Sequence, residues 1–418
     1  MKKFIAMITA ACIIGGAAPT FESWAPDAVI TADAADTVAS GTCGESVNWS
    51  LDDAGNLTIS GEGAMYNWKF STFTSKDGVI DVVNFEGDPM PWFEQRSSIK
   101  SIVIEDGVTS VGDLAFLGLG EVTDISLPDS LLTIGEYSFT GCVGITSIDI
   151  PDSVTRIRSD AFRYCTGLSD VRLSESITTL TASLFEGCTS LETITVPVAV
   201  SKISYSAFKG CSSLKTIVIP EDNASFTSRD GVLFNKDMTA LLRCPEGWNG
   251  TEYTVPDTVT SIGEAAFYSC VVLEEVTLPS SVKSISIDAF NEYGFNGSEA
   301  SLKALTILAP SCDIYDVGNT ITDNVCIYGY IGSTAQEYAE NYERTFVSIG
   351  ELGDVNGDTY VDSSDAALIL RHYAAYQADS VGTFNEAQLA VADYNSDGSV
   401  DSSDAAMILK YYAENQAK

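Results

Sequence analysis

Two acidic stretches near the C-terminus contain the residues best suited to chemistry. The first runs from Asp354 to Asp365 and reads D-V-N-G-D-T-Y-V-D-S-S-D; the second runs from Asp393 to Asp404 and reads D-Y-N-S-D-G-S-V-D-S-S-D. In both, positions 1, 3, 5, 9 and 12 have side-chain oxygen atoms, and position 7 can offer its backbone carbonyl. This is the ligand spacing of a twelve-residue calcium loop, in which the cation collects about six to eight oxygens. Two matches 39 residues apart, each followed by an apolar helical run, predict a pair of calcium loop–helix units.

The rest of the sequence offers few residues for other chemistry. His372 is the only histidine, which argues against a His-dependent triad and against a His-rich metal site. Neither a phosphate-binding glycine loop nor a G-x-S-x-G nucleophile turn is present in the sequence. A glycosidase could work with two carboxylates alone, and acidic residues are plentiful, so that alternative stays open. We expect a protein without catalytic activity.

Composition and the N-terminus indicate an exported protein. The 418 residues are enough for two or three domains, and the net charge of −36 argues against nucleic acid or an anionic membrane as a partner. Lys2 and Lys3 precede an apolar stretch, Phe4–Ala18, that is too short to span a membrane. An A-x-A site at residues 32–34 would allow cleavage, so we predict a signal peptide over residues 1–34.

A repeat of mostly 23 residues begins at Ile99. One unit, residues 191–211, reads L-x-x-I-x-V-P, then an isoleucine, then A-F-x-G-C. The alternating apolar residues predict a strand, which ends at the proline because proline lacks the N–H that a ladder needs. No coil buries its apolar side alone, so we expect stacked coils with a parallel sheet and phenylalanines inside. The phenylalanines that mark the repeat are Phe116, Phe139, Phe162, Phe185, Phe208, Phe267 and Phe290.

The cysteines follow the same repeat. Ten are present, and nine remain if Cys12 leaves with the signal peptide, since the residues before Cys12 fit a lipoprotein site poorly. Their shared position three residues after a phenylalanine predicts a buried ladder of small side chains rather than a disulfide framework. The five cysteines at this position are Cys142, Cys165, Cys188, Cys211 and Cys270.

Less regular segments flank and interrupt the repeats. Residues 41–98 show short strands at 46–51 and 56–60, which predicts an N-terminal β cap. Its tryptophans favour core packing over stacking on sugars; they are Trp49, Trp68 and Trp92. Between Phe208 and Phe267, residues 231–242 predict an inserted hairpin, followed by a strand-like end at Cys244–Pro245. Closing strands at 326–330 and 346–349 around a helix at 334–342 predict a C-terminal cap.

The repeats over about residues 99–310 resemble the BspA-type leucine-rich repeat family. The matching motif is I-P-x-S-V-x-x-I-x-x-x-A-F-x-x-C at Ile150–Cys165, with a D-G-V-L-F insertion at Asp230–Phe234. The family is largely bacterial and extracellular, so the resemblance implies binding or adhesion, while the ligand, protein or glycan, stays open. The outward strand positions show neither an aromatic platform nor a basic stripe; they are Val103, Ser126, Asp149, Arg172, Thr195, Val218, Thr277 and Thr306.

Residues 354–418 resemble a type I dockerin, in which two calcium loop–helix units bind a cohesin module on a scaffold protein. As in that family, position 12 is Asp; loop 1 has Thr359 at position 6, where loop 2 has Gly398. The resemblance implies two Ca²⁺ ions, held by Asp354, Asn356, Asp358, Tyr360 (carbonyl), Asp362 and Asp365, and by Asp393, Asn395, Asp397, Ser399 (carbonyl), Asp401 and Asp404. The implied cohesin contacts are Ser363, Ser364, Arg371, Ser402, Ser403 and Lys410. Because both units read D-S-S-D-A-A-x-I-L-[RK]-x-Y-A, docking in two orientations is expected.

The expected architecture is a mixed β-rich solenoid of leucine-rich repeats with a parallel sheet and β caps, plus a small all-α calcium-binding dockerin domain. We place the signal peptide at 1–34, the N-terminal cap at 41–98, the solenoid with its C-terminal cap at 99–349, and the dockerin at 351–418. The expected function is that of a secreted, extracellular, non-catalytic binding or adhesion protein, anchored through a dockerin–cohesin interaction to a cellulosome-type scaffold or cell surface. The alternatives are a polysaccharide-degrading enzyme of such an assembly and a secreted inhibitor or host-contact protein.

Overall fold

The computed structural model describes residues 36–76, 79–270, 272–291, 301–379 and 381–416. The predicted signal peptide lies outside these residues. None of the described helices is long and apolar enough to cross a membrane.

The N-terminal segment adds antiparallel strands to the edge of the solenoid. β1 (Thr37–Thr42), β2 (Val47–Asp52) and β3 (Asn56–Gly61) form a meander, so both strands predicted in this segment are confirmed. β3 pairs in parallel with β7 (Ser101–Ile104), which joins the meander to the repeats. The remaining elements are β4 (Gly63–Ala64), the β5–β6 hairpin (Phe70–Lys76 and Val79–Phe85) and the 3₁₀-helix η1 (Phe93–Ser98).

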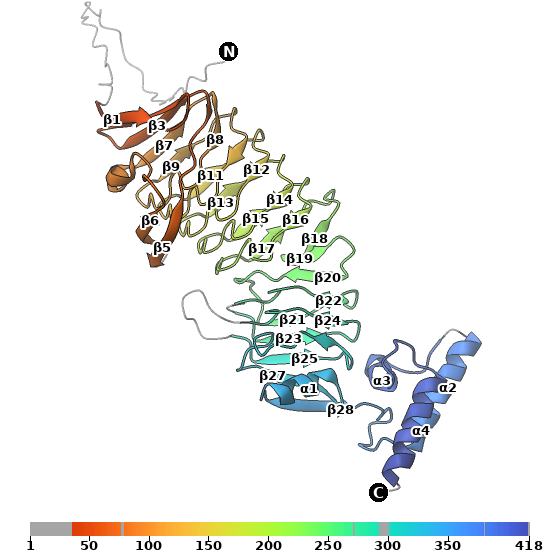
Figure 1. Cartoon of the computed structure of the whole chain (residues 1–418). Helices are drawn as coiled ribbons and strands as arrows, with labels where there is room; N and C mark the ends of the chain where they lie inside the picture. Colours follow the sequence, from red (N-terminus) through yellow and green to blue (C-terminus); the bar gives the residue numbers. More distant parts are fainter. Residues whose placement is uncertain (1–35, 77–78, 271, 292–300, 380, 417–418) are drawn as a thin grey trace, which may run out of the picture. The chain divides into compact units, whose positions relative to one another are not determined.

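Each regular coil contributes two short parallel strands on two faces of the solenoid (Figure 1). The register advances by one repeat per coil: Ser147 lies opposite Asp170 on one face, and Thr133 opposite Arg156 on the other. The first face has β9 (Asp124–Ser126), β11 (Ser147–Asp149), β13 (Asp170–Arg172), β15 (Thr193–Thr195) and β17 (Thr216–Val218). The second face has β8 (Val108–Val111), β10 (Thr133–Ile134), β12 (Arg156–Ile157), β14 (Thr179–Leu180) and β16 (Lys202–Ile203).

Stacked aromatic rings fill the interior of these coils, as predicted. Five consecutive ring pairs from Trp92 to Phe208 have centroids 5.2–6.3 Å apart and planes within 21° of parallel. Trp49 and Trp68 pack edge-on against Trp92, each with centroids 5.7 Å from it, which confirms core packing of the tryptophans. Aromatic pairs of this kind stabilise a core beyond the area they bury.

The cysteine ladder runs beside the ring stack. The thiols of Cys142, Cys165, Cys188 and Cys211 each donate to a phenylalanine carbonyl of the preceding coil, at 3.1–3.3 Å. Burial raises the pKa of all four thiols. The thiol of Cys270, the fifth member, lies 3.8 Å from the carbonyls of Cys244 and Pro245 instead. Every cysteine within the described residues is free of disulfide bonds and all five are buried, so the predicted ladder of buried thiols is confirmed.

The long gap between Phe208 and Phe267 holds an antiparallel insertion. β19 (Val232–Asn235) and β20 (Ala240–Arg243) form the predicted hairpin, and β18 (Phe226–Arg229), which the sequence did not reveal, pairs with β19. The strand-like end predicted at Cys244–Pro245 is wrong: β20 ends at Arg243, whose buried side chain bonds to the turn that follows. The coils then resume with β21 (Glu252–Thr254), β22 (Ser261–Ile262), β23 (Glu275–Leu278), β24 (Ser284–Ile285), β25 (Ala304–Ile307) and β26 (Asp313–Ile314).

Two parallel strands and a helix close the repeat region. β27 (Cys326–Ile331) pairs with β28 (Phe346–Glu351), and α1 (Thr334–Asn341) lies between them in sequence, as predicted. The helical region follows, with α2 (Ser363–Asp379), α3 (Glu386–Ala392) and α4 (Ser402–Gln416). α2 packs on α4 around a small core that includes Ile369 and Ile408. The predicted fold class, a β-rich solenoid with parallel sheets followed by a small helical region, is confirmed.

Candidate functional site

The first residue of each acidic loop fixes the turn of that loop. Asp354 accepts hydrogen bonds from the backbone amides of positions 4, 5 and 6, at 2.8–3.1 Å. Asp393 accepts from positions 5 and 6 of the second loop, at 3.1 and 2.9 Å. Each carboxylate thereby folds the chain around itself.

The last residue of each loop is buried and joins the two ends of the loop. Asp365 accepts from the amides of Val355 and Asn356, at 2.8 and 3.0 Å, and from Asp362 at 3.0 Å. Asp404 makes the matching bonds to positions 3 and 9, at 3.1 and 2.9 Å. Burial raises the pKa of both carboxyl groups, and neighbouring carboxylates of the same loop raise it further. Negative charge is therefore concentrated inside each loop.

The middle positions repeat one pattern in both loops. Position 3 accepts from the amide of position 5, position 5 from that of position 7, and position 9 from that of position 11, at 2.6–2.9 Å. All ten side chains that the sequence identified as calcium ligands therefore accept bonds from the backbone of their own loop. Tyr360 and Ser399, predicted to act through their carbonyls, occupy position 7 in each loop.

The donor set of the loops has the chemistry that calcium requires. It consists of carboxylate, amide and carbonyl oxygens, which are the ligands of a hard cation. Among the described residues, no group of three or more His, Cys, Asp or Glu side chains is gathered closely enough to hold a metal ion. The loops therefore carry the oxygen types of a calcium site at the loop positions that such a site uses, and in this structure these oxygens accept bonds from backbone amides.

Both loops need left-handed backbone at positions 4 and 6. In loop 1 these are Gly357, with φ of 78°, and Thr359, with φ of 73°. In loop 2 they are Ser396, with φ of 59°, and Gly398, with φ of 85°. Because a β-branched residue is strained in this region, loop 1 makes its turn at a conformational cost that loop 2 avoids.

The residues predicted to contact a partner are all exposed at the start of α2 and α4 or on their outer surface; they are Ser363, Ser364, Arg371, Ser402, Ser403 and Lys410. The hydroxyls of Ser364 and Ser403 donate to the position-9 carboxylate of their own loop, both at 2.7 Å. Sequence reasoning missed Leu370 and Leu409, which are 43% and 42% exposed at matching positions. The I-L-[RK] triplet, which occurs in both units, is the sequence signal that could have identified these two leucines.

A histidine breaks the symmetry between the two units. His372 is 6% exposed, where the second unit has Tyr411. Its Nδ1 accepts bonds from the amides of Thr383 and Phe384, at 3.0 and 3.1 Å, and its ring stacks on Phe384 with centroids 4.2 Å apart. Burial lowers the pKa of the imidazole. The neutral ring therefore holds the segment between α2 and α3.

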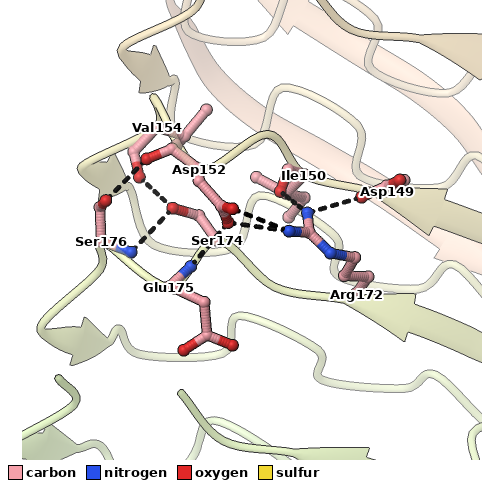
Figure 2. Close-up of polar contacts among 8 residues, drawn as sticks. All are labelled: Asp149, Ile150, Asp152, Val154, Arg172, Ser174, Glu175 and Ser176. Carbon is pink, nitrogen blue, oxygen red and sulfur yellow. Dashed lines mark hydrogen bonds and ion pairs between the residues drawn. The ribbon is translucent and has the colours of Figure 1, made fainter. Parts of the chain in front are cut away.

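On the first face of the solenoid, the two charged members of the predicted outward row, Asp149 and Arg172, bond to each other. Figure 2 shows Arg172 bound to Asp149 at 2.9 Å, to the carbonyl of Ile150 at 3.0 Å, and to both carboxylate oxygens of Asp152. Asp152 also accepts from the amide of Glu175 at 3.1 Å. Coil-to-coil ion pairs likewise engage Lys100 with Glu121, Lys215 with Glu192, and Lys303 with Glu274.

Comparison with known proteins gives the same two-part division. Residues 89–229 and 246–309 match the BspA type leucine rich repeat region, in six copies, and residues 352–412 match the dockerin type I domain. No curated protein matches the chain.

The solved structures similar to this chain are bacterial leucine-rich repeat proteins. One, from Eubacterium ventriosum ATCC 27560, is 21% identical and covers 70% of this chain and 80% of its own, with a TM-score of 0.50. Another, a leucine rich cell surface protein from Faecalibacterium prausnitzii A2-165, is 22% identical and covers 78% of this chain and 99% of its own, with a TM-score of 0.41. At this identity, the first likeness supports the fold alone.

Proposed function

We propose that this chain, which combines BspA-type leucine-rich repeats with a type I dockerin domain, is an exported, non-catalytic binding protein that docks onto a cohesin module of a cellulosome-type scaffold. The observation that carries the proposal is the duplicated hydrogen-bond pattern of the two loops, each leading into a helix with a matching exposed surface. Residues 1–34 would export the chain.

Two calcium ions would organise the docking module. Type I dockerins generally bind calcium, and the proposed ligands are the twelve residues at positions 1, 3, 5, 7, 9 and 12 of the two loops. When bound, the ion supplies positive charge that offsets the carboxylates clustered in each loop. Asp365 and Asp404 would then fix the start of each helix relative to its loop. This proposal is supported by the match over residues 352–412.

The cohesin contact would centre on an apolar pair rimmed by polar residues. Leu370 and Leu409 are the exposed apolar side chains beside Arg371 and Lys410, and buried apolar anchors dominate most protein interfaces. Because the two units match, the module would dock through either one. Changing Leu370 or Leu409 alone to aspartate should weaken binding by only a few fold, since the other unit still docks, whereas changing both should abolish it.

The solenoid would supply binding rather than turnover. Its carboxyl groups with strongly raised pKa, Asp160 at about 6 and Glu246 at about 7, are buried and held by Arg163 and Arg243. Groups engaged in this way maintain the coils and do not face a substrate. Release of sugars from plant polysaccharides by the purified protein, lost on changing one carboxylate, would overturn the non-catalytic part of the proposal.

The decisive experiment measures cohesin binding by the full chain. We expect tight binding in calcium, and at least about a hundredfold weakening in chelator or in an Asp354→Ala/Asp393→Ala variant, because the loops no longer hold the helices. The matched control is Asp129→Ala/Asp257→Ala, which removes the same charge from exposed turns of the solenoid and should bind as the parent does. Undiminished cohesin binding both in chelator and in the loop variant would contradict the docking proposal.

A further inference from the structure

The second face of the solenoid, which carries the shorter strands, is hollowed. Two depressions, of about 590 and 390 Å³, lie on it, and both are lined by Arg156 and Arg158. Because these residues line both, the depressions adjoin and form one groove, which spans β8, β10, β12 and β14. At the usual spacing of neighbouring strands, about 4.8 Å, the groove extends roughly 14 Å along the stacked coils.

The groove wall is polar and rich in hydroxyl groups. The larger depression is lined by Thr155, Ser159, Thr178, Thr179 and Thr181, and Ile157 is its sole aliphatic residue. A groove that recognises a peptide normally supplies apolar pockets for side chains, and this one does not. Hydroxyl-lined walls that run across several coils suit a ligand that is itself an extended chain of hydroxyl groups, which describes a polysaccharide.

Of the two arginines in the groove, Arg158 is paired with carboxylates, whereas, in the part of the chain that the structure describes, Arg156 is not. Arg158 is bound to Asp113 and Glu136, at 2.7 and 2.8 Å, which uses the two carboxylates of the groove. Arg156 is exposed and enters none of the ion pairs among the described residues. On the first face, by contrast, Arg172 is fully engaged by Asp149 and Asp152.

A second cation extends the same row. The residues at this strand position, one repeat apart, are Ser110, Thr133, Arg156, Thr179 and Lys202; the two cations are exposed and the other three side chains are half-buried. Lys202 is exposed and enters no ion pair in the described parts of the chain. Arg156 and Lys202 are two coils apart, or roughly 10 Å at the usual strand spacing. Acidic groups on a ligand that lies along the coils would meet both.

We propose that this groove binds a carboxylated polysaccharide of the uronic-acid type. Arg156 binds a carboxylate of the ligand, and the hydroxyl groups of the threonines that line the groove bond to sugar hydroxyls. Arginine presents a planar fork of N–H donors that matches a carboxylate. The net charge of −36 does not prevent this, because exposed charges more than about 8 Å away are largely screened at physiological salt. The inference rests on the proposed function in taking the solenoid as the binding part of the chain.

The test is calorimetric titration of the full chain with soluble oligogalacturonates long enough to span the groove. Arg156→Gln should weaken binding about tenfold or more, as expected for loss of a charge-assisted pair. The affinity of Arg156→Lys should lie between that of the parent chain and that of Arg156→Gln, because lysine keeps the positive charge but lacks the planar fork of N–H donors. The matched control, Arg172→Gln, removes the same charge from the first face and should bind within about twofold of the parent. Unchanged thermal melting shows that each variant is folded.

Four outcomes would overturn the proposal. The first three are no binding of oligogalacturonates by the parent chain, equal losses in Arg156→Gln and Arg172→Gln, and equally tight binding of polyglutamate, which would indicate an acidic peptide or unspecific charge attraction. Binding that persists when the same oligomers are methyl-esterified would also contradict it, since the carboxylate would then contribute nothing. Cohesin binding by the same preparations reports separately on the docking proposal, and Arg156→Gln should leave it unchanged.

Discussion

The threonine in loop 1 is a residue-scale weakness that the chain itself shows how to repair. Thr359 has a φ of 73° at a position where loop 2 has Gly398. Thr359→Gly should stabilise the calcium-loaded module by about 1 kcal/mol, because glycine adopts this conformation without strain. The reciprocal change, Gly398→Thr, should destabilise it by a similar amount. Thermal melting in calcium measures both, and a destabilised Thr359→Gly would show that the turn is not strained.

His372 should make the helical module sensitive to mild acid. Its Nδ1 accepts two backbone bonds, so the folded state holds the neutral ring and the pKa lies below its usual 6.5. A histidine with a lowered pKa contributes stability that is present above about pH 6.5 and is lost as the pH falls. We expect the melting temperature of the calcium-loaded module to fall between about pH 7 and pH 5.5.

A non-titrating variant isolates this effect. In His372→Asn, the side-chain oxygen can accept the same amide bonds but takes up no proton in this range. Its melting temperature should therefore be flat over the window in which the parent declines. If the melting temperatures of the parent and of His372→Asn fell equally steeply with pH, other groups would be the cause of the decline.

At the residue scale, the features that could be predicted from the sequence are those whose residues have a fixed spacing along the chain. The loop ligands occupy fixed positions in a twelve-residue loop, so the amino-acid sequence alone locates them, although whether they bind calcium stays a prediction. The contact between His372 and Phe384 was not readable, because it joins a helix to a loop without a fixed offset. Arg156 was missed because only one strand of each coil was followed along the repeat.

At the scale of elements, the inserted coil is held by one buried ion pair. Arg243 and Glu246 are 4% and 2% exposed and lie 2.7 Å apart, and Glu246 also accepts from the amide of Gly210 at 2.7 Å. Burial raises the pKa of Glu246 to about 7, with Arg243 opposing the rise. Removing one member of such a pair leaves the other charge buried and uncompensated.

Arg243→Met should therefore destabilise the solenoid in a pH-dependent way. We expect a loss of about 3 to 5 kcal/mol at pH 8, where Glu246 must be buried as an anion or bind a proton on folding. A raised carboxyl pKa contributes stability that is present at low pH and is lost as the pH rises, so part of the loss should be recovered at pH 5. Urea denaturation at the two pH values measures this. In the double variant Arg243→Met/Glu246→Gln, the pH dependence of this loss should vanish. If the pH dependence persisted, Glu246 would not be its source.

The regular coils were more predictable than the insertion. Apolar alternation that stops at a proline identified the strands of the first face, and a cysteine three residues after each phenylalanine identified the ladder. The second-face strands are as short as two residues, such as Thr133–Ile134, and so have no alternation to detect. β18 was missed because its apolar content lies in one residue, Phe226, within a polar stretch.

At the scale of the whole molecule, removing calcium should affect one part of the chain only. The helical module packs around a small core, which also takes in Tyr330 of β27 and is distinct from the two large cores of the repeats. At a thousandfold excess over the dissociation constant, bound calcium adds about 4 kcal/mol to the stability of the state that binds it. Calorimetry of the full chain should therefore show one transition that moves with chelator and one that does not.

The loop variant checks the assignment of the moving transition. In Asp354→Ala/Asp393→Ala, chelator should no longer shift either transition, because the ligands at position 1 are gone. A chelator shift of the larger transition would place calcium in the repeats and contradict the assignment. The division into a repeat part and a helical part was readable from the change in periodicity.

The interrupted stack of rings also affects how the chain folds during synthesis. Parallel ring contacts link adjoining coils from Trp92 to Phe208 and resume between Phe267 and Phe290. Each coil can therefore be added to its predecessor without residues from far ahead in the chain. The first core ends near Leu233, so nearly half of the polypeptide has yet to be translated when that core has all its residues. Its last coil then offers a finished edge on which the later coils can assemble as they emerge.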